Sequence, residues 1–149
     1  LVIFSGGHIP TQNAFFRRVD MKRLIHGYDG VLIGISAGTM NSARIVYSHP
    51  EREGEAASKD FVRFFDGLGL TEIEVIPHYQ LIKGTTLDGM RLFEDVAYPD
   101  SFTHELHVFP DGTYIYIDGD HQEIRGEAYL IRDGVFKKIS DDGETVRIK

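Results

Sequence analysis

The sequence predicts an α/β fold with a parallel sheet, and three features lead to this prediction. An apolar run at residues 31–35 passes directly into the G-x-S-x-G pattern at 34–38, which is followed by a helix-compatible stretch at 39–44. A second apolar run, at 1–4, is joined to the first by an amphipathic stretch at 12–26 with helical spacing. The C-terminal third has short apolar segments between Asp-Gly turns, which are typical of β-hairpins.

The first 38 residues predict a strand–helix–strand unit. Residues 1–4 form the first buried strand, which ends in Ser5-Gly6-Gly7-His8. The helix at 12–26 ends at Gly27, and the second buried strand occupies 31–35. Because the carboxyl ends of parallel strands meet at one edge of a sheet, we expect the Gly6-Gly7 loop to adjoin the Gly34–Gly38 turn.

The remaining elements follow from shorter patterns. After the elbow we expect an extended piece at 45–47, a charged surface loop at 48–57 and an apolar turn at 61–65. These are followed by a strand at 72–77 and a helix at 86–97. The C-terminal strands are expected at 106–109, 113–117, 126–131 and 135–139. We interpret these strands as a β-meander packed on the α/β core, so that residues 1–149 form a single domain.

Composition excludes several classes of protein. A hydrophobic content of 42% and a charged content of 26% are ordinary for a globular domain. The absence of cysteine excludes a disulfide scaffold, a thiolate metal site and a cysteine nucleophile. A net charge of −7 without a basic cluster argues against a nucleic-acid partner. There is no apolar run of about 20 residues and no signal peptide, so we expect no membrane association and a cytoplasmic location.

The start of the chain leads to a further expectation. Residue 1 is Leu rather than Met, and the first predicted strand begins there. Since a parallel sheet normally has several strands, we expect this chain to be the later part of a longer polypeptide whose N-terminal strands are missing. An exposed first strand would allow pairing with another chain, such as a homodimer.

Ser36 is the predicted nucleophile. A serine between a buried strand and a helix sits on a tight turn, where bulky neighbours two positions away would clash, and Gly34 and Gly38 avoid that clash. The adjoining helix N-terminus favours a developing oxyanion. The alternative is a glycine-rich turn with an incidental serine.

A serine nucleophile needs a base, an acid and an oxyanion hole. His78 follows a predicted strand and Pro77, so it should lie at a strand end, and His8 is the main alternative. The acidic candidates between Ser36 and His78 are Glu51, Glu53, Glu55, Asp60 and Asp66. The backbone N–H groups of Ala37 and Gly7 are the expected oxyanion donors.

These motifs resemble the dipeptidase E and cyanophycinase family of serine peptidases. The resemblance rests on Gly6-Gly7, on the elbow at 34–38 and on Pro77-His78-Tyr79, and it covers most of residues 1–80. It implies a class I glutamine amidotransferase-like fold, which is a three-layer αβα sandwich with a mostly parallel sheet.

The resemblance also implies roles for individual residues. It places the triad acid fifteen residues after the serine, at Glu51, with Glu53 and Glu55 as alternatives. Two positions depart from the family pattern: His8 stands where the Gly-Gly loop usually continues with Asn, and Tyr47 stands where an aspartyl dipeptidase has Arg. We expect His8 and Tyr47 to contact the substrate, without specificity for an N-terminal aspartate.

The predicted function is that of a serine-type exo- or dipeptidase that acts on small peptides and needs no metal or cofactor. Two alternatives remain: a catalytically silent amidotransferase-like binding or regulatory domain, and an esterase of the α/β-hydrolase kind. The esterase is disfavoured because the base comes only 42 residues after the nucleophile and the β-meander follows it.

Overall fold

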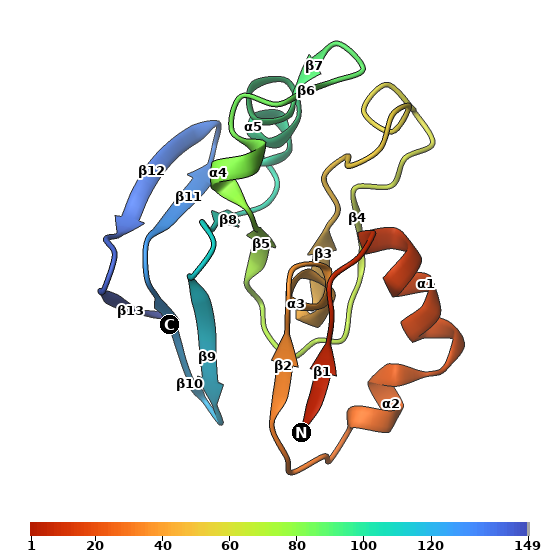
Figure 1. The fold of residues 1–149 in the computed structure, drawn as a ribbon, viewed down its shortest axis with the longest axis vertical. Helices are drawn as coiled ribbons and strands as arrows, with labels where there is room; N and C mark the ends of the chain where they lie inside the picture. Colours follow the sequence, from red (N-terminus) through yellow and green to blue (C-terminus); the bar gives the residue numbers. More distant parts are fainter. Residues whose placement is uncertain (149) are drawn as a thin grey trace. The chain divides into compact units, whose positions relative to one another are not determined.

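The computed structural model describes residues 1–148. They divide into two compact units, one over residues 1–75 and one that begins at residue 76. Each unit is described by itself (Figure 1). Both combine helices with strands, so the fold is mixed α/β, as predicted. The prediction of a single domain stays a prediction.

The first unit begins with the predicted strand–helix–strand arrangement. Strand β1 (Val2–Phe4) pairs in parallel with β2 (Leu32–Gly34), with Ile3 opposite Ile33. Between them the chain forms α1 (Ile9–Arg18) and α2 (Met21–Ile25). The single predicted helix at 12–26 is therefore wrong: Asp20 adopts a left-handed conformation with φ of 52° and separates the two helices.

The elbow is followed by α3 (Ala37–Ser42) and then by the antiparallel pair β3 (Ile45–Tyr47) and β4 (Phe64–Asp66). The segment expected to be an apolar turn at 61–65 thus contributes to a strand, because its apolar residues pair with β3. A parallel bridge between Ala43 and Thr71 extends the parallel pairing of this unit.

Two apolar clusters form the core of the first unit. Phe4, Phe16 and Leu68 pack together, joined by partly buried residues of α2 and β2. Ile9, Ala37, Met40 and Val46 form the second cluster. The rings of Phe4 and Phe16 lie 5.1 Å apart, which connects β1 to α1. Of the apolar face predicted for residues 12–26, Phe16 and Ile25 therefore pack in the first cluster, whereas Phe15 and Leu24 are exposed.

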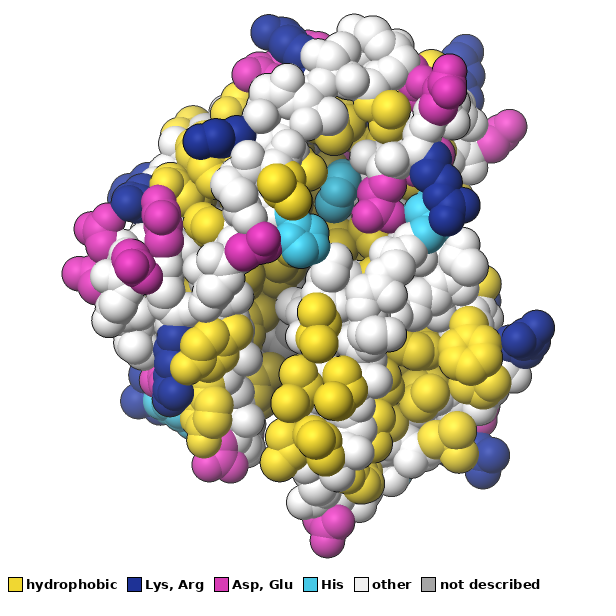
Figure 2. Space-filling view, in the orientation of Figure 1, with side chains coloured by type: hydrophobic (Ala, Val, Ile, Leu, Met, Phe, Trp, Pro, Cys, Tyr) yellow, Lys and Arg dark blue, Asp and Glu magenta, His cyan; other side chains and the backbone are white. Residues whose placement is uncertain are grey.

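The sequence predicted that β1 and β2 are buried on both faces. This prediction is wrong. Large apolar side chains remain exposed on this pair and at its ends: Leu1, Ile3, Val31, Ile33 and Ile35. Figure 2 shows hydrophobic side chains gathered on the surface over β1 and β2. The runs at 1–4 and 31–35 lack the polar alternation that usually marks a one-sided sheet, so the sequence pattern did not reveal the exposed face.

In the second unit a four-stranded sheet has the order β12-β11-β8-β5. Its strands are β5 (Glu74–Ile76), which crosses the boundary between the units, β8 (Leu106–Val108), β11 (Ala128–Arg132) and β12 (Val135–Ser140). A three-stranded sheet has the order β13-β10-β9, with β9 (Tyr114–Asp118), β10 (His121–Arg125) and β13 (Thr145–Ile148).

The pairings β8–β11, β11–β12, β9–β10 and β10–β13 are all antiparallel. The sheets described are therefore mostly antiparallel, and the structure does not confirm a mostly parallel three-layer sandwich. The hairpin predicted at Arg132-Asp133-Gly134 is present as β11 and β12. The turn at Asp118-Gly119-Asp120 joins β9 to β10 rather than to the strand predicted at 126–131, and the turn at Pro110-Asp111-Gly112 forms no hairpin, because β8 and β9 belong to different sheets. Strands β10 and β13 were not predicted. Both of these strands carry charged residues, which conceal their strand pattern.

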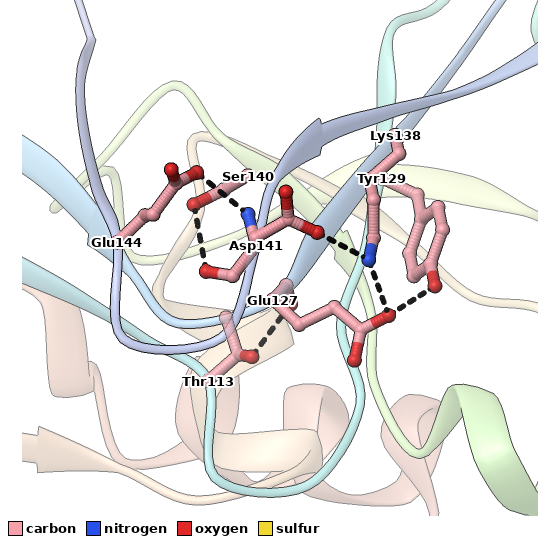
Figure 3. A network of polar contacts seen from close by, with 7 residues as sticks. All are labelled: Thr113, Glu127, Tyr129, Lys138, Ser140, Asp141 and Glu144. Carbon is pink, nitrogen blue, oxygen red and sulfur yellow. Dashed lines mark hydrogen bonds and ion pairs between the residues drawn. The ribbon is translucent and has the colours of Figure 1, made fainter.

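A polar network joins strands β11 and β12 of this unit (Figure 3). Lys138 lies 3.2 Å from Glu127 and 2.6 Å from Asp141, and Tyr129 donates a hydrogen bond to Glu127. The two carboxylates raise the pKa of Lys138, and hydrogen bonds from Tyr129 and Lys138 lower the pKa of Glu127. The network holds the ends of this hairpin together.

The predicted helix at 86–97 is wrong over its first half, and its second half is helical. Residues 86–91 form a hairpin of β6 (Thr86–Leu87) and β7 (Met90–Arg91), and a π-helical segment, η1 (Leu92–Ala97), follows and leads into α5 (Tyr98–Asp100). Asp88 and Gly89, with φ of 52° and 80°, make the two-residue turn that an Asp-Gly pair favours. The apolar residues at helical spacing concealed this signal.

Among residues 1–148, none of the helices is both long enough and apolar enough to cross a bilayer.

Candidate active site

Ser36 occupies the turn between β2 and α3, as the G-x-S-x-G pattern predicts. Its backbone angles are φ 52° and ψ −115°, outside the regions that non-glycine residues normally adopt. A β-carbon on Gly34 would lie 2.8 Å from the Thr39 backbone, and one on Gly38 would lie 1.9 Å from the Phe4 carbonyl oxygen. Both glycines are therefore required for space, which is the steric reason predicted from the sequence.

The Gly6-Gly7 loop adjoins Ser36. A β-carbon added to Gly6 would lie 3.4 Å from Cβ of Ser36, and the Ile35 N–H donates a 2.9 Å hydrogen bond to the Phe4 carbonyl. The expectation that the two loops meet at one sheet edge is confirmed. Gly7 has φ of 149°, which other residues rarely adopt.

Ala37 is the first residue of α3 and is fully buried. The first N–H groups of a helix have no partner within the helix, so they suit an anion. Of the two predicted oxyanion donors, Ala37 directly follows Ser36 in the chain, and Gly7 follows Gly6, the residue that lies against Ser36.

A buried amide pair connects α1 to α3. Asn41 is fully buried, and its Nδ2 donates to the carbonyl groups of Ile9 and Ala37 and to Oε1 of Gln12. Its Oδ1 accepts a 2.9 Å hydrogen bond from Nδ2 of Asn13. Because these bonds are shielded from water, they hold the helix that follows Ser36 against the helix that follows the Gly6-Gly7 loop.

In the second unit, His78 lies just after β5 and before the short helix α4 (Tyr79–Ile82). It is in the left-handed conformation, with φ of 59° and ψ of 38°. Its Nδ1 lies 2.6 Å from Oδ1 of Asp111, and the Asp111 N–H donates to Oε1 of Gln80. Sequence reasoning assigned Asp111 only to the Pro110-Asp111-Gly112 turn and missed this contact.

Ser36 and His78 both have a positive φ, which is uncommon for residues other than glycine. Among the described residues, those with positive φ other than glycine are Asp20, Ser36, His78, Asp88 and Asp133. Aspartate tolerates the left-handed region because its short side chain bonds to nearby backbone. Histidine is also enriched in the left-handed region, which accounts for His78. Ser36, with ψ of −115°, lies outside that region, and strained residues cluster at functional sites.

Glu51, the predicted acid, accepts a 3.2 Å hydrogen bond from the N–H of Ile9, the first residue of α1. Desolvation of the carboxyl group raises the pKa of Glu51, although the Ile9 hydrogen bond and His8 oppose this shift. Its carboxylate provides the negative charge that the first turn of α1 lacks.

Glu55 forms a more extensive set of contacts. Its Oε1 lies 2.8 Å from Nε2 of His8, and its Oε2 accepts hydrogen bonds from the N–H groups of Glu51 and Arg52. Desolvation is the largest single influence and favours the neutral acid, but the three hydrogen bonds together outweigh it and lower the pKa of Glu55. Glu53 is exposed.

The two predicted substrate contacts have packed surroundings. Nδ1 of His8 lies 2.8 Å from Oγ1 of Thr11, so both ring nitrogens of His8 have protein partners. The Tyr47 side chain is only 1% exposed, and its ring centre lies 5.1 Å from that of Phe64. These surroundings favour structural roles for both residues.

A cavity of about 420 Å³ opens beside His8 and Glu55 in the first unit. Its walls are largely apolar, from Phe61, Val62 and Phe65, and Arg17 lies at its border. The volume falls in the range of small-molecule sites. No cluster of three or more metal-ligating side chains occurs within residues 1–148.

The comparison with family models decides the identity of the chain. The model of peptidase family S51 matches residues 21–125, a range that includes Ser36, Glu51, His78 and Asp111. The chain belongs to peptidase family S51. The predicted resemblance to dipeptidase E and cyanophycinase is thereby confirmed, although the Gly6-Gly7 loop precedes the matched range. A comparison with curated proteins found no match.

Proposed function

We propose that this member of family S51 is a serine-type peptidase in which Ser36 is the nucleophile and His78 the general base. The observation that carries the proposal is the strained backbone of Ser36, in an elbow whose flanking glycines have no room for a side chain. Such strain is retained where function requires it. The place of His78 directly after β5, with Nδ1 2.6 Å from Asp111, supports the second role.

The proposed reaction follows from these groups. Oγ of Ser36 attacks the carbonyl carbon of the scissile peptide bond while His78 accepts its proton. The N–H groups of Gly7 and Ala37 stabilise the negative oxygen, and the C–N bond breaks as His78 returns the proton to the amine. Water then attacks the acyl-enzyme, and Ser36 recovers its proton.

Two carboxylates are candidates for orienting His78. The contact of 2.6 Å between Nδ1 of His78 and Asp111 favours Asp111, because an acid on Nδ1 leaves Nε2 to take the proton from serine. Glu51 remains the candidate from the family resemblance, with Glu53 and Glu55 beside it. The hydrogen bond from the Ile9 N–H to Glu51 supports a different role for Glu51, at the start of α1.

Four further features complete the proposal. The substrate is a small peptide, the location is cytoplasmic, and the exposed apolar side chains of β1 allow a homodimer. A three-layer αβα sandwich with a mostly parallel sheet is the proposed complete fold, supported by the parallel β1–β2 pair and the Ala43–Thr71 bridge.

The test is labelling with a fluorophosphonate, measured by intact mass, on the wild-type chain and on Ser36→Ala and His78→Ala. One adduct on the wild type that is lost in both variants is the expected result. If the folded wild-type chain forms no adduct, the serine-peptidase proposal fails, and a silent binding domain is the better description. A peptide library and simple esters, compared on the same protein, then separate a peptidase from an esterase.

A further inference from the structure

The side chain of His8 is held on both sides. Nε2 lies 2.8 Å from the Glu55 carboxylate and Nδ1 lies 2.8 Å from the Thr11 hydroxyl. The side chains of His8 and Glu55 are only 12% and 16% exposed. A ring with both nitrogens engaged has no nitrogen left for a substrate unless one of these bonds breaks.

The loop at residues 51–55, which contains Glu55, makes a second connection to the segment after Gly7. Glu51 accepts from the N–H of Ile9, and Glu55 in turn accepts from the N–H groups of Glu51 and Arg52. The carboxylate of Glu55 therefore orders the loop and also forms a hydrogen bond with His8. The residues that follow Gly7 are thus tied to the loop at His8 and at Ile9.

The segment before Gly7 is tied to the elbow and to α1. The Phe4 carbonyl accepts from the N–H of Ile35, the Ser5 carbonyl accepts from Nε2 of Gln12 at 2.6 Å, and Gly6 lies against Ser36. Gly7 is the link between these two anchored segments.

No neighbouring atom crowds the side of Gly7 on which a side chain would stand. A β-carbon at this position would meet no atom within 4 Å, and its φ of 149° is one that only glycine adopts readily. The direction of the Gly7 N–H therefore depends on the residues to which its neighbours are bound. On the C-terminal side, the neighbour is His8, and its partner is Glu55.

We propose that His8 is a positioning residue: bound to Glu55, it fixes the direction of the Gly7 N–H toward the oxyanion formed at Ser36. This inference rests on the proposed function. It replaces the expectation of a substrate contact at His8, and it assigns to the 51–55 loop the role of holding the oxyanion loop in place.

Two substitutions of His8 distinguish its hydrogen bond with Glu55 from its hydrogen bond with Thr11. A glutamine amide nitrogen stands at the same distance along the side chain as Nε2, and an asparagine amide nitrogen at the same distance as Nδ1. His8→Gln therefore keeps a donor for Glu55, and His8→Asn keeps a polar group only for Thr11. Only His8→Gln therefore keeps the hydrogen bond to the 51–55 loop.

The experiment measures phosphonylation of Ser36 by a small alkyl fluorophosphonate, which has no peptide side chains. Its phosphoryl oxygen takes the place of the oxyanion, so the maximal rate reports the donors, and the half-saturating concentration reports binding. Since removal of a whole oxyanion donor costs about 10²–10³ in rate, we expect His8→Asn to lose roughly tenfold or more in maximal rate, at unchanged half-saturation. His8→Gln should label close to the wild-type rate.

Glu55→Gln tests the same bond from the other partner. Its amide oxygen still accepts from the Glu51 and Arg52 N–H groups. Its NH₂ can only donate to Nε2 of His8, so the bond loses the carboxylate charge and requires the other tautomer, and a smaller reduction in maximal rate than that of His8→Asn is expected. This second variant is decisive if His8→Asn fails to fold, as judged by circular dichroism.

The outcomes are distinct. Wild-type labelling rates in folded His8→Asn and Glu55→Gln overturn the inference, and a raised KM for peptides with normal labelling assigns His8 to substrate binding instead. An equal loss of rate in His8→Gln and His8→Asn also contradicts it. A wild-type chain that forms no adduct defeats the proposed function itself, and the positioning role with it.

Discussion

The carbonyl oxygen of Phe4 would lie 1.9 Å from a β-carbon on Gly38, so β1 and the first turn of α3 touch backbone to backbone. The same carbonyl accepts a hydrogen bond from Ile35. The residue that ends β1 therefore determines both the path into the elbow and the path out of it.

Gly38→Ala should accordingly destabilise the chain. Since the contacts are with backbone atoms that cannot turn aside, we expect a loss of roughly 3 kcal/mol or more in the free energy of unfolding, measured by urea denaturation. Gly6→Ala is the matched control, because its β-carbon would meet only ordinary contacts at 3.4 Å or more. A loss in Gly38→Ala no larger than that in Gly6→Ala would contradict the close approach.

Asn41→Leu should also cost stability, although leucine has a similar size. The substitution removes the donor to the Ile9 and Ala37 carbonyls and leaves buried polar atoms without partners. About 2–4 kcal/mol is expected from several such losses. Ser42→Ala, which removes one hydrogen bond to the Gly38 carbonyl from a partly exposed side chain, should cost about 1 kcal/mol or less. Equal losses in the two variants would mean that the amide network adds little.

The acid that orients His78 can be identified by comparing Asp111→Asn with Glu51→Gln. If Asp111 holds the imidazole, Asp111→Asn should slow Ser36 phosphonylation by about 10² or more, while Glu51→Gln stays within roughly threefold of the wild type. The Asp111 side chain is 58% exposed, so its substitution should leave the fold intact. The reverse pattern would assign the triad acid to Glu51, as the family resemblance implies.

Glu51 and Glu55 should contribute to stability with opposite dependence on pH. The pKa of Glu55 is lowered on folding, so its contribution is present above the ordinary value of 4.5 and is lost as the pH falls below it. The pKa of Glu51 is raised, so its ionisation on the alkaline side of 4.5 costs stability. Relative to the wild type, Glu55→Gln should be less stable at neutral pH, and the difference should shrink on acidification.

Glu51→Gln should instead gain relative to the wild type as the pH rises above 4.5. Thermal unfolding of the three proteins across this range measures both trends. Parallel curves for the two variants would show that the two carboxylates do not differ in the predicted way.

How far the sequence predicts the structure depends on the range of the interaction. The elbow and its glycines, the ends of β1 and β2 and the hairpin of β11 and β12 were predicted because each depends on neighbours within a few residues. The first half of the helix at 86–97 was predicted wrongly because the spacing of Leu87, Met90 and Phe93 suits a helix, yet the Asp88-Gly89 turn decides the local backbone.

The candidate site divides in the same way. The sequence by itself determined the strained serine between glycines, the strand-end histidine and the family to which the chain belongs, since these are written as contiguous motifs. Only the tertiary structure decided that His78 meets Asp111, that Glu51 caps α1 and that His8 is bound by Glu55. Those partners are 33, 42 and 47 residues apart, and a hydrogen bond over such a separation leaves no periodicity in the sequence, because it depends on how the loops fold back on one another.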